Sequence, residues 1–197
     1  MNDPQIRRAF HHTFLHKEHT ESNTLVLDEL GLEHGKCRAD IAVINGHLNG
    51  FEIKSDKDSL CRLGYQIEIY NAVFDHASVV LADRHLNEAT CIVPEWWGVI
   101  LVTSDLNSEL LFKTIRPPRQ NTSVNDYAVA QLLWREEAQE VLMNLGVRGM
   151  QLKEKRSNLY YYIVEMLNSQ ELRFLVREYL KKRRDWRHPE QPFLCDG

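Results

Sequence analysis

The first hydrophobic pattern in the chain repeats every four residues. Ile6, Phe10 and Phe14 follow an Asp3-Pro4 pair. An acidic residue followed by proline is typical of the start of a helix. We therefore expect Asp3 to cap a short amphipathic helix that ends near Lys17.

The pattern then changes to runs typical of β-strands. These runs are residues 24–32, 37–44 and 48–54, and His34-Gly35 and Asn45-Gly46 supply turn signals between them. Short connections favour neighbouring antiparallel strands, so the three runs predict an antiparallel meander.

A second helix is expected to open at Asp58 or Ser59. Its apolar face repeats at helical spacing through Leu60, Leu63, Ile67, Tyr70 and Phe74. A continuous apolar run at 78–82 then predicts a buried strand, and 97–102 predicts another. The order of elements indicates an α/β fold: helix, three-strand antiparallel meander, helix and strand.

Residues 116–123 have the composition of a loop and predict a boundary. Beyond them the pattern is helical throughout. We expect one helix from Asp126 to Leu145, one capped by Ser157 and one beginning after Ser169. The predicted organisation is a core over residues 1–115 and an all-helical C-terminal unit over residues 122–187.

Composition favours a protein of the cytoplasm. Hydrophobic residues make up 43% of the chain, enough for one sizeable core. The four cysteines are scattered without a CxxC pair, so neither a zinc ribbon nor a disulfide framework is expected. No apolar run reaches the roughly 18 residues that span a bilayer, and the first residues lack the apolar segment of a secretory signal. A membrane partner is not expected.

The charge is divided unevenly between the two predicted units. Residues 1–112 hold 9 Lys/Arg and 17 Asp/Glu, a net charge of −8, whereas residues 113–187 hold 15 and 9, a net charge of +6. An acidic half that can bind cations is thus joined to a basic half that can bind phosphates.

The candidate chemistry lies on the second and third predicted strands. Asp40 is on the first of these, and Glu52 and Lys54 are two residues apart on the next, so both project from one strand face. Burying an acid in a sheet is costly unless it is paired or binds a cation. Mg²⁺ or Mn²⁺ would supply that cation, and the lysine could position or deprotonate a water molecule.

Hairpin register adds a third acid. A tight turn at residues 33–36 makes paired residue numbers sum to 69, which sets Glu29 opposite Asp40, and two opposed acids destabilise a sheet unless a cation lies between them. In the next hairpin, a three-residue connection would set Glu52 opposite Asp40, whereas a two-residue turn would put Phe51 there. The sequence leaves that choice open.

These residues resemble a known nuclease motif. Asp40 followed by Glu52-Ile53-Lys54 is similar to the bipartite motif of the PD-(D/E)XK superfamily, with Ala39 in place of its proline. Gln66 and Tyr70 resemble the QxxxY signature of its RecB-like branch. The stretch from residue 50 to residue 70 also resembles a small uncharacterised bacterial family in the same superfamily.

The resemblance implies a restriction-endonuclease-like core and metal-dependent hydrolysis of phosphodiester bonds, in DNA and in a setting such as defence. Its implied metal ligands are Asp40, Glu52 and the carbonyl of Ile53, and register adds Glu29. Lys54 would act on the water, with Gln66 and Tyr70 beside it. The superfamily often draws an acid from its first helix, which makes Glu18 a rival to Glu29.

A basic stripe on the last helix is the predicted nucleic-acid contact. Arg173, Arg177, Lys181 and Arg184 share one helical face suited to tracking phosphates. The alternative is that cations stabilise a helix C-terminus. Cutting both strands of DNA usually needs two sites, which favours a homodimer.

Other interpretations remain open. A nuclease fold could bind DNA or a partner protein without cutting, or the helical unit could bind DNA as part of a regulator. The acids and Lys54 could also form a solvated strand face with a surface ion pair.

Overall fold

The protein has a mixed α/β fold built on one six-stranded sheet. The structure is a computed structural model that describes residues 1–183. The strands lie side by side in chain order: β1 (Leu25–Leu32), β2 (Cys37–Ile44), β3 (Leu48–Lys54), β4 (His76–Ala82), β5 (Gly98–Ser104) and β6 (Leu110–Arg116). β1 to β3 form the expected antiparallel meander, β4 and β5 add in parallel, and β6 returns antiparallel at the edge. The strand at β6 was not predicted.

The N-terminal helix differs from its prediction in two ways. It is broken into α1 (Asp3–Ala9), a π-helical turn (Phe10–Phe14) and α2 (His16–Thr20). Its N-cap is Asn2, so the expected cap at Asp3 is wrong by one residue. Asn2 and Gln5 exchange side-chain to backbone hydrogen bonds of 3.0 and 2.9 Å, a reciprocal cap that leaves Asp3 inside the helix.

The second helix begins later than expected. α3 (Leu63–Val73) starts several residues beyond Asp58, and the start predicted at residues 58–59 is wrong. The carboxylate of Asp58 instead accepts hydrogen bonds from the backbone N–H and the hydroxyl of Ser55, at 2.8 and 2.5 Å, which holds the segment in a turn. A short helix after β4, α4 (Leu86–Ile92), was not predicted.

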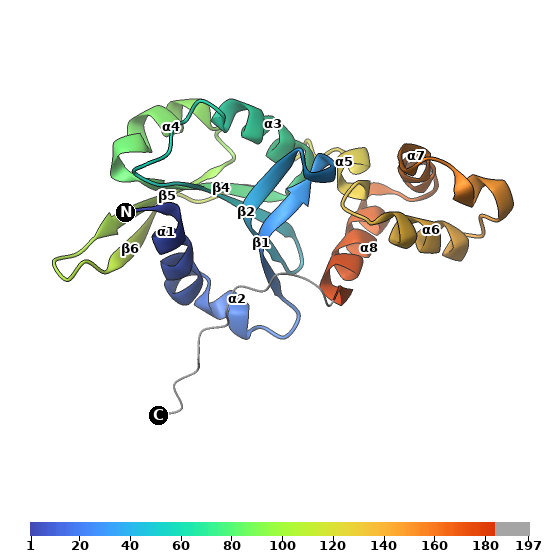
Figure 1. Ribbon diagram of the computed structural model, residues 1–197, viewed down its shortest axis with the longest axis horizontal. Coiled ribbons are helices and arrows are strands. Elements are labelled where there is room, and N and C mark those ends of the chain that lie inside the picture. Colours follow the sequence, from blue (N-terminus) through green and yellow to red (C-terminus); the bar gives the residue numbers. More distant parts are fainter. Residues whose placement is uncertain (184–197) are drawn as a thin grey trace.

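The two faces of the sheet are covered differently. Below it in Figure 1, α1 contributes Ile6, and the π-helical turn after it contributes Phe10, to a cluster that includes Ile41 and Ile53. Above it, α3 and α4 cover the opposite face. A helix on each face explains why the central strand β4 is almost entirely apolar and buried.

Up to residue 183, where the described part of the chain ends, the helical segment holds four α-helices, not the three predicted. They are α5 (Asp126–Ala130), α6 (Arg135–Asn144), α7 (Arg156–Met166) and α8 (Ser169–Lys182). The single helix expected over 126–145 is wrong because Trp134 adopts an extended backbone and its N–H donates to Glu137, which starts a new helix. The expected caps are also wrong: Lys155 precedes α7, and Asn168 caps α8.

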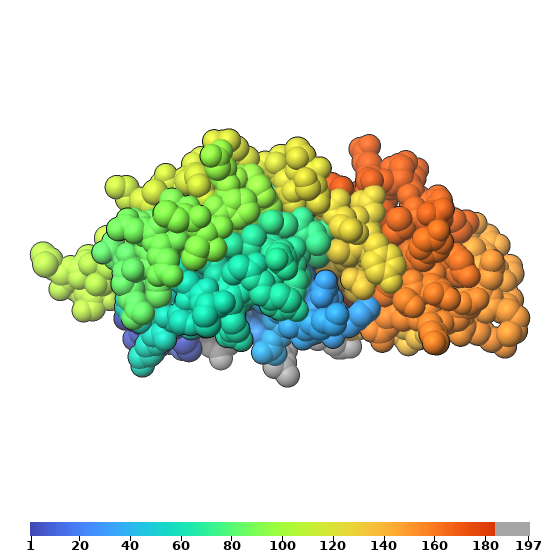
Figure 2. Space-filling model, turned by 90° about the horizontal axis from the view of Figure 1, so that it is seen from above, coloured from blue at the N-terminus to red at the C-terminus, as the bar shows by residue number. Residues whose placement is uncertain are grey.

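These helices share a buried cluster with the sheet. Leu159 and Val176 belong to the same cluster of buried side chains as Leu27 and Val79. In Figure 2 the C-terminal helices, orange and red, lie directly against the rest of the molecule. The boundary predicted at residues 116–123 stays a prediction. Within residues 1–183, no helix is long and apolar enough to cross a membrane.

Candidate active site

The hairpin between β2 and β3 adopts the register that the chemistry needs. Ile44 pairs with Leu48, which leaves a three-residue connection, and Ile41 pairs with Phe51. One step further along this register, Glu52 comes opposite Asp40. The two-residue alternative is therefore excluded.

Glu52 is the centre of a buried hydrogen-bond network. Its side chain is 2% exposed, and its oxygens accept from Lys54 Nζ at 2.7 Å, Gln66 Nε2 at 2.5 Å and the Tyr70 hydroxyl at 2.8 Å. The Gln66 amide oxygen accepts a further bond from Lys54 Nζ at 2.9 Å. Because Gln66 and Tyr70 lie one turn apart on α3, both reach the same strand residue. Burial, followed by the charge of Glu52, raises the pKa of Tyr70, which keeps its hydroxyl protonated as a donor.

Asp40 lies where β2 begins to separate from β3. One carboxylate oxygen accepts the Ile53 backbone N–H at 2.7 Å, in place of a strand-to-strand bond, and the other accepts from Arg7 at 3.1 Å. Burial raises the pKa of Asp40 to about 7, and repulsion from Glu52 adds to the effect. The two acids thus interact, as a pair that shares a cation would.

Arg7 is the site residue that the sequence did not reveal. It extends from α1, donates to the Asp40 backbone carbonyl as well as its carboxylate, and lies 3.2 Å from Glu29 and 3.6 Å from Asp28. Burial lowers the pKa of Arg7, but the carboxylates around it outweigh burial and raise it overall, so Arg7 stays charged. The cation expected between Glu29 and Asp40 is, in this structure, the guanidinium of Arg7.

Glu29 has the predicted register but an unexpected conformation. The pairs Asp28–Ile41 and Leu30–Ala39 both sum to 69, which confirms the register on either side of it. Glu29 itself has φ 56°, and the β1 residues in the larger buried cluster change across it from odd numbers (Leu25 and Leu27) to even numbers (Leu30 and Leu32). Its carboxylate is 40% exposed and contacts the guanidinium of Arg38 at 3.0 Å as well as Arg7. Its role as a metal ligand stays a prediction.

The rival acid and the N-terminal histidines lie elsewhere in the structure. Glu18 is on α2, and one of its oxygens is buried without a hydrogen-bond partner. His11, in the π-helical turn, is buried. It lies between Asp28 at 2.9 Å and His19 at 3.0 Å, which explains how an imidazole is satisfied inside the core.

Asp40 and Glu52 are the residues of this site that could hold a magnesium-type ion. Within the described part of the chain, no three His, Cys, Asp or Glu side chains are grouped as a metal site. Mg²⁺ needs only one or two carboxylates, with water and phosphate oxygens as its other ligands. Asp40 and Glu52 provide such a pair, and their mutual repulsion is what a divalent cation would relieve.

A cleft of about 830 Å³ gives access to this cluster. Asp40 and Gln66 line it together with residues from the tip of the β1–β2 hairpin and the start of α3. In Figure 2 these two segments, blue and teal, lie side by side on the same face. Asp40 and Gln66 can therefore be reached from outside the protein, whereas Glu52 and Lys54 are buried and do not line the cleft.

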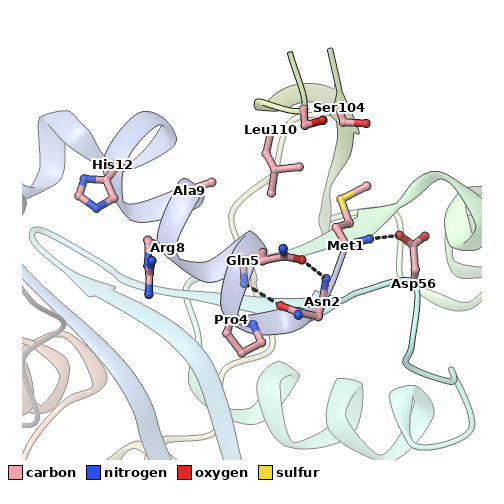
Figure 3. A pocket seen from close by; sticks show the side chains of 11 residues that line it. Met1, Asn2, Pro4, Gln5, Arg8, Ala9, His12, Asp56, Ser104 and Leu110 are labelled. Atoms are coloured by element: carbon pink, nitrogen blue, oxygen red, sulfur yellow. Dashed lines mark hydrogen bonds and ion pairs between the residues drawn. The ribbon is translucent and has the colours of Figure 1, made fainter. Parts of the chain in front are cut away.

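A second pocket, of about 750 Å³, lies beside α1 and is separate from this cluster (Figure 3). Its polar groups are largely used within the chain. Asn2 and Gln5 bind each other, and the N-terminal amine binds Asp56 at 2.7 Å. We assign it no role.

The predicted basic stripe is partly engaged in internal ion pairs. Arg173 lies 3.6 Å from the buried Asp75 and 3.4 Å from Asp126, and Lys181 Nζ lies 2.5 Å from Glu178. The structure thus does not present these two as free cations. Arg177 lines a small pocket, and Arg184 lies outside the described residues. A role for the stripe in binding nucleic acid stays a prediction.

The protein is thus of the mixed α/β class. Its site is a buried polar cluster of Glu52, Lys54 and Gln66, beside a cleft that Asp40 and Gln66 line. Residues 2–192 match the family of Bacteriophage P4 protein cII, and the chain belongs to that family. Protein cII of Enterobacteria phage P4 is 32% identical over 134 residues, which are 68% of this chain. The chain spans about half the length of this curated relative, 50% of which is covered. A protein of unknown function from Silicibacter pomeroyi, SPO1766, is 13% identical, with 74% of this chain and 93% of that chain covered and a TM-score of 0.43.

Proposed function

We propose that this chain is a metal-dependent nuclease that hydrolyses phosphodiester bonds in DNA and has a core of the PD-(D/E)XK, restriction-endonuclease-like kind. The observation that carries the proposal is the convergence of Asp40, Glu52, Lys54 and Gln66 from two strands and one helix. A solvated strand face would not bury Glu52 and Lys54 and satisfy both with side-chain partners.

In this proposal Asp40, Glu52 and the carbonyl of Ile53 would hold Mg²⁺ or Mn²⁺, and Glu29 would support the ion directly or through water. The bound ion would neutralise charge that develops on the scissile phosphate. Lys54 would orient the attacking water, while Gln66 and Tyr70 would hold Glu52 and Lys54 in place. The location would be the cytoplasm, and a homodimer would cut both strands.

One observation favours a second candidate, a module that binds DNA or a partner protein without cutting. Lys54 already donates to Glu52, and Arg7 already donates to Asp40, so both acids have a cationic partner within the chain. A protein that never bound a metal would need such internal partners.

Cleavage assays separate the two candidates. The protein is incubated with plasmid, linear and single-stranded DNA in Mg²⁺, Mn²⁺ or EDTA. We expect cleavage in either metal, none in EDTA, and loss of cleavage in Asp40→Asn and Lys54→Ala. The matched control is Glu88→Gln, a change to an exposed acid on α4. Absence of cleavage by the wild type under all conditions, or equal cleavage by the Asp40 and Lys54 variants, would overturn the nuclease proposal.

A further inference from the structure

The walls of the active-site cleft differ in character from its acidic floor. The β1–β2 hairpin contributes Lys36 and Arg38, and the start of α3 contributes Arg62 and Tyr65. Three cations and one aromatic ring therefore surround the opening that leads to Asp40. Cationic walls favour a phosphate-bearing ligand.

The cations differ in how firmly they are paired. Arg38 is bound to Glu29 at 3.0 Å, and Lys36 is 3.7 Å from Glu33 with 70% of its side chain exposed. Arg62 is exposed, and no acid lies within ion-pair distance of it among the residues that the structure describes. Arg62 and Lys36 are thus available to bind phosphates from opposite sides of the cleft.

Tyr65 is the unusual residue of this surface. It is 51% exposed on the first turn of α3, although its neighbours Leu63 and Ile67 are buried in the core. It lines the cleft together with Asp40 and Gln66, and Gln66 in turn binds the buried Glu52. An exposed aromatic ring beside exposed cations is the combination that binds a single nucleic-acid strand, with a base stacked on the ring and phosphates on the cations.

We propose that this cleft binds a nucleic-acid segment that carries an unpaired base, with the base stacked on Tyr65 and the flanking phosphates on Arg62 and Lys36. The reason for an unpaired base is geometric: inside a duplex both faces of each base are covered by its neighbours, so a side chain cannot stack on them. The inference deepens the proposed function by naming its substrate class, and it rests on that function for placing the scissile phosphate beside Asp40. Binding itself can be tested apart from cleavage.

The test compares binding of a labelled single-stranded oligonucleotide and a duplex of the same sequence. Binding is followed by fluorescence anisotropy over a salt series in Ca²⁺, which occupies a magnesium-type site and is chosen not to support cleavage. We expect tighter binding of the single strand, weakened roughly tenfold or more by Tyr65→Ala and little changed by Tyr65→Phe. Arg62→Gln should reduce the slope of the logarithm of the binding constant against the logarithm of salt concentration by the amount expected for about one phosphate contact.

Tyr161→Ala is the matched control, because Tyr161 is similarly exposed, at 56%, but lies on α7 away from the cleft lining. Equal binding by the wild type and Tyr65→Ala, or an equal loss in the control, would overturn the inference. So would a duplex that binds as tightly as the single strand.

The outcomes for the two proposals are separable. A wild type that binds the single strand through Tyr65 but cuts nothing in Mg²⁺ or Mn²⁺ would refute the nuclease function and support the binding site. A wild type that cuts DNA, with binding indifferent to Tyr65, would refute the binding site and leave the nuclease function standing.

Discussion

Replacing Asp40 with asparagine should stabilise the protein at alkaline pH and much less at acidic pH. Asparagine keeps an oxygen that can accept the Ile53 N–H, but it carries no charge to repel Glu52. In the wild type, the pKa of Asp40 is raised from 3.8 to about 7 by burial and by Glu52. The folded protein therefore retains a proton at Asp40 over a pH range in which the unfolded chain has lost it.

The sign and size of the effect follow from this difference. Wherever the folded state binds more protons than the unfolded state, the free energy of unfolding falls as the pH rises. Between pH 5 and pH 8, a pKa change from 3.8 to about 7 removes about 2–3 kcal/mol from the wild type. Asp40→Asn has no acid at this position and does not lose this stability. The difference in free energy of unfolding between Asp40→Asn and the wild type should therefore increase by up to about 2–3 kcal/mol from pH 5 to pH 8.

The assay is urea denaturation of both proteins in EDTA at pH 5, 6, 7 and 8, followed by tryptophan fluorescence. Mg²⁺ at pH 8 should then raise the free energy of unfolding of the wild type more than that of the variant, because the ion relieves the repulsion only where both acids are present. Glu88→Gln controls for loss of a charge at an exposed position. Parallel pH dependence in the wild type and Asp40→Asn would refute the assignment of a strained acid pair.

Three further changes test the surroundings of the site. Arg7→Gln should raise the pKa of Asp40 further, because a cation is lost, and shift the acidic limb of the pH–rate profile for DNA cleavage upward by roughly 1–2 pH units. Arg173→Gln should lower the free energy of unfolding by roughly 1–3 kcal/mol in urea, because it leaves the buried Asp75 without its guanidinium. Gly50→Ala should cost roughly 1–3 kcal/mol in the same assay, because the added methyl group would lie 2.6 Å from a buried aromatic ring.

Each change has a control nearby. Arg8→Gln removes a neighbouring cation from α1, Arg177→Gln removes one from α8, and Gly31→Ala adds a methyl group to β1 where nothing lies within 4 Å. An unshifted pH profile in Arg7→Gln would contradict the proposed coupling to Asp40. Stability losses as large in the Arg177 and Gly31 controls would show that the effects are not specific to the buried partners.

The sequence predicted those parts of the fold that depend on local patterns. The meander from Leu25 to Lys54 was placed almost to the residue, because alternation and tight turns are encoded within each hairpin. The break before Trp134 and the late start of α3 were missed, since both depend on one side chain, Glu137 or Asp58, outcompeting a helix that the wider pattern allows.

The site shows the same division. Glu52, Lys54 and the pair Gln66 and Tyr70 could be selected because strand and helix spacing place them on defined faces, and the structure brings them together. Arg7 could not be selected in this way, because its partner Asp40 lies 33 residues away in the sequence. Spacing within one helix or one hairpin does not predict a contact between a helix and a distant strand. Its spacing along α1 marks it only as one cation among several.

Arg7 also explains how two opposed requirements are met at one place. A metal site needs acids close together, but close acids destabilise the sheet before the metal arrives. The guanidinium between Glu29 and Asp40 offsets that repulsion, and its donors leave Asp40 lone pairs unused, because each carboxylate oxygen can accept two hydrogen bonds. Glu52 is offset in the same way by Lys54. The internal cations that suit a non-cleaving protein are therefore also what a folded protein needs in order to hold an acid pair in place before a divalent ion binds.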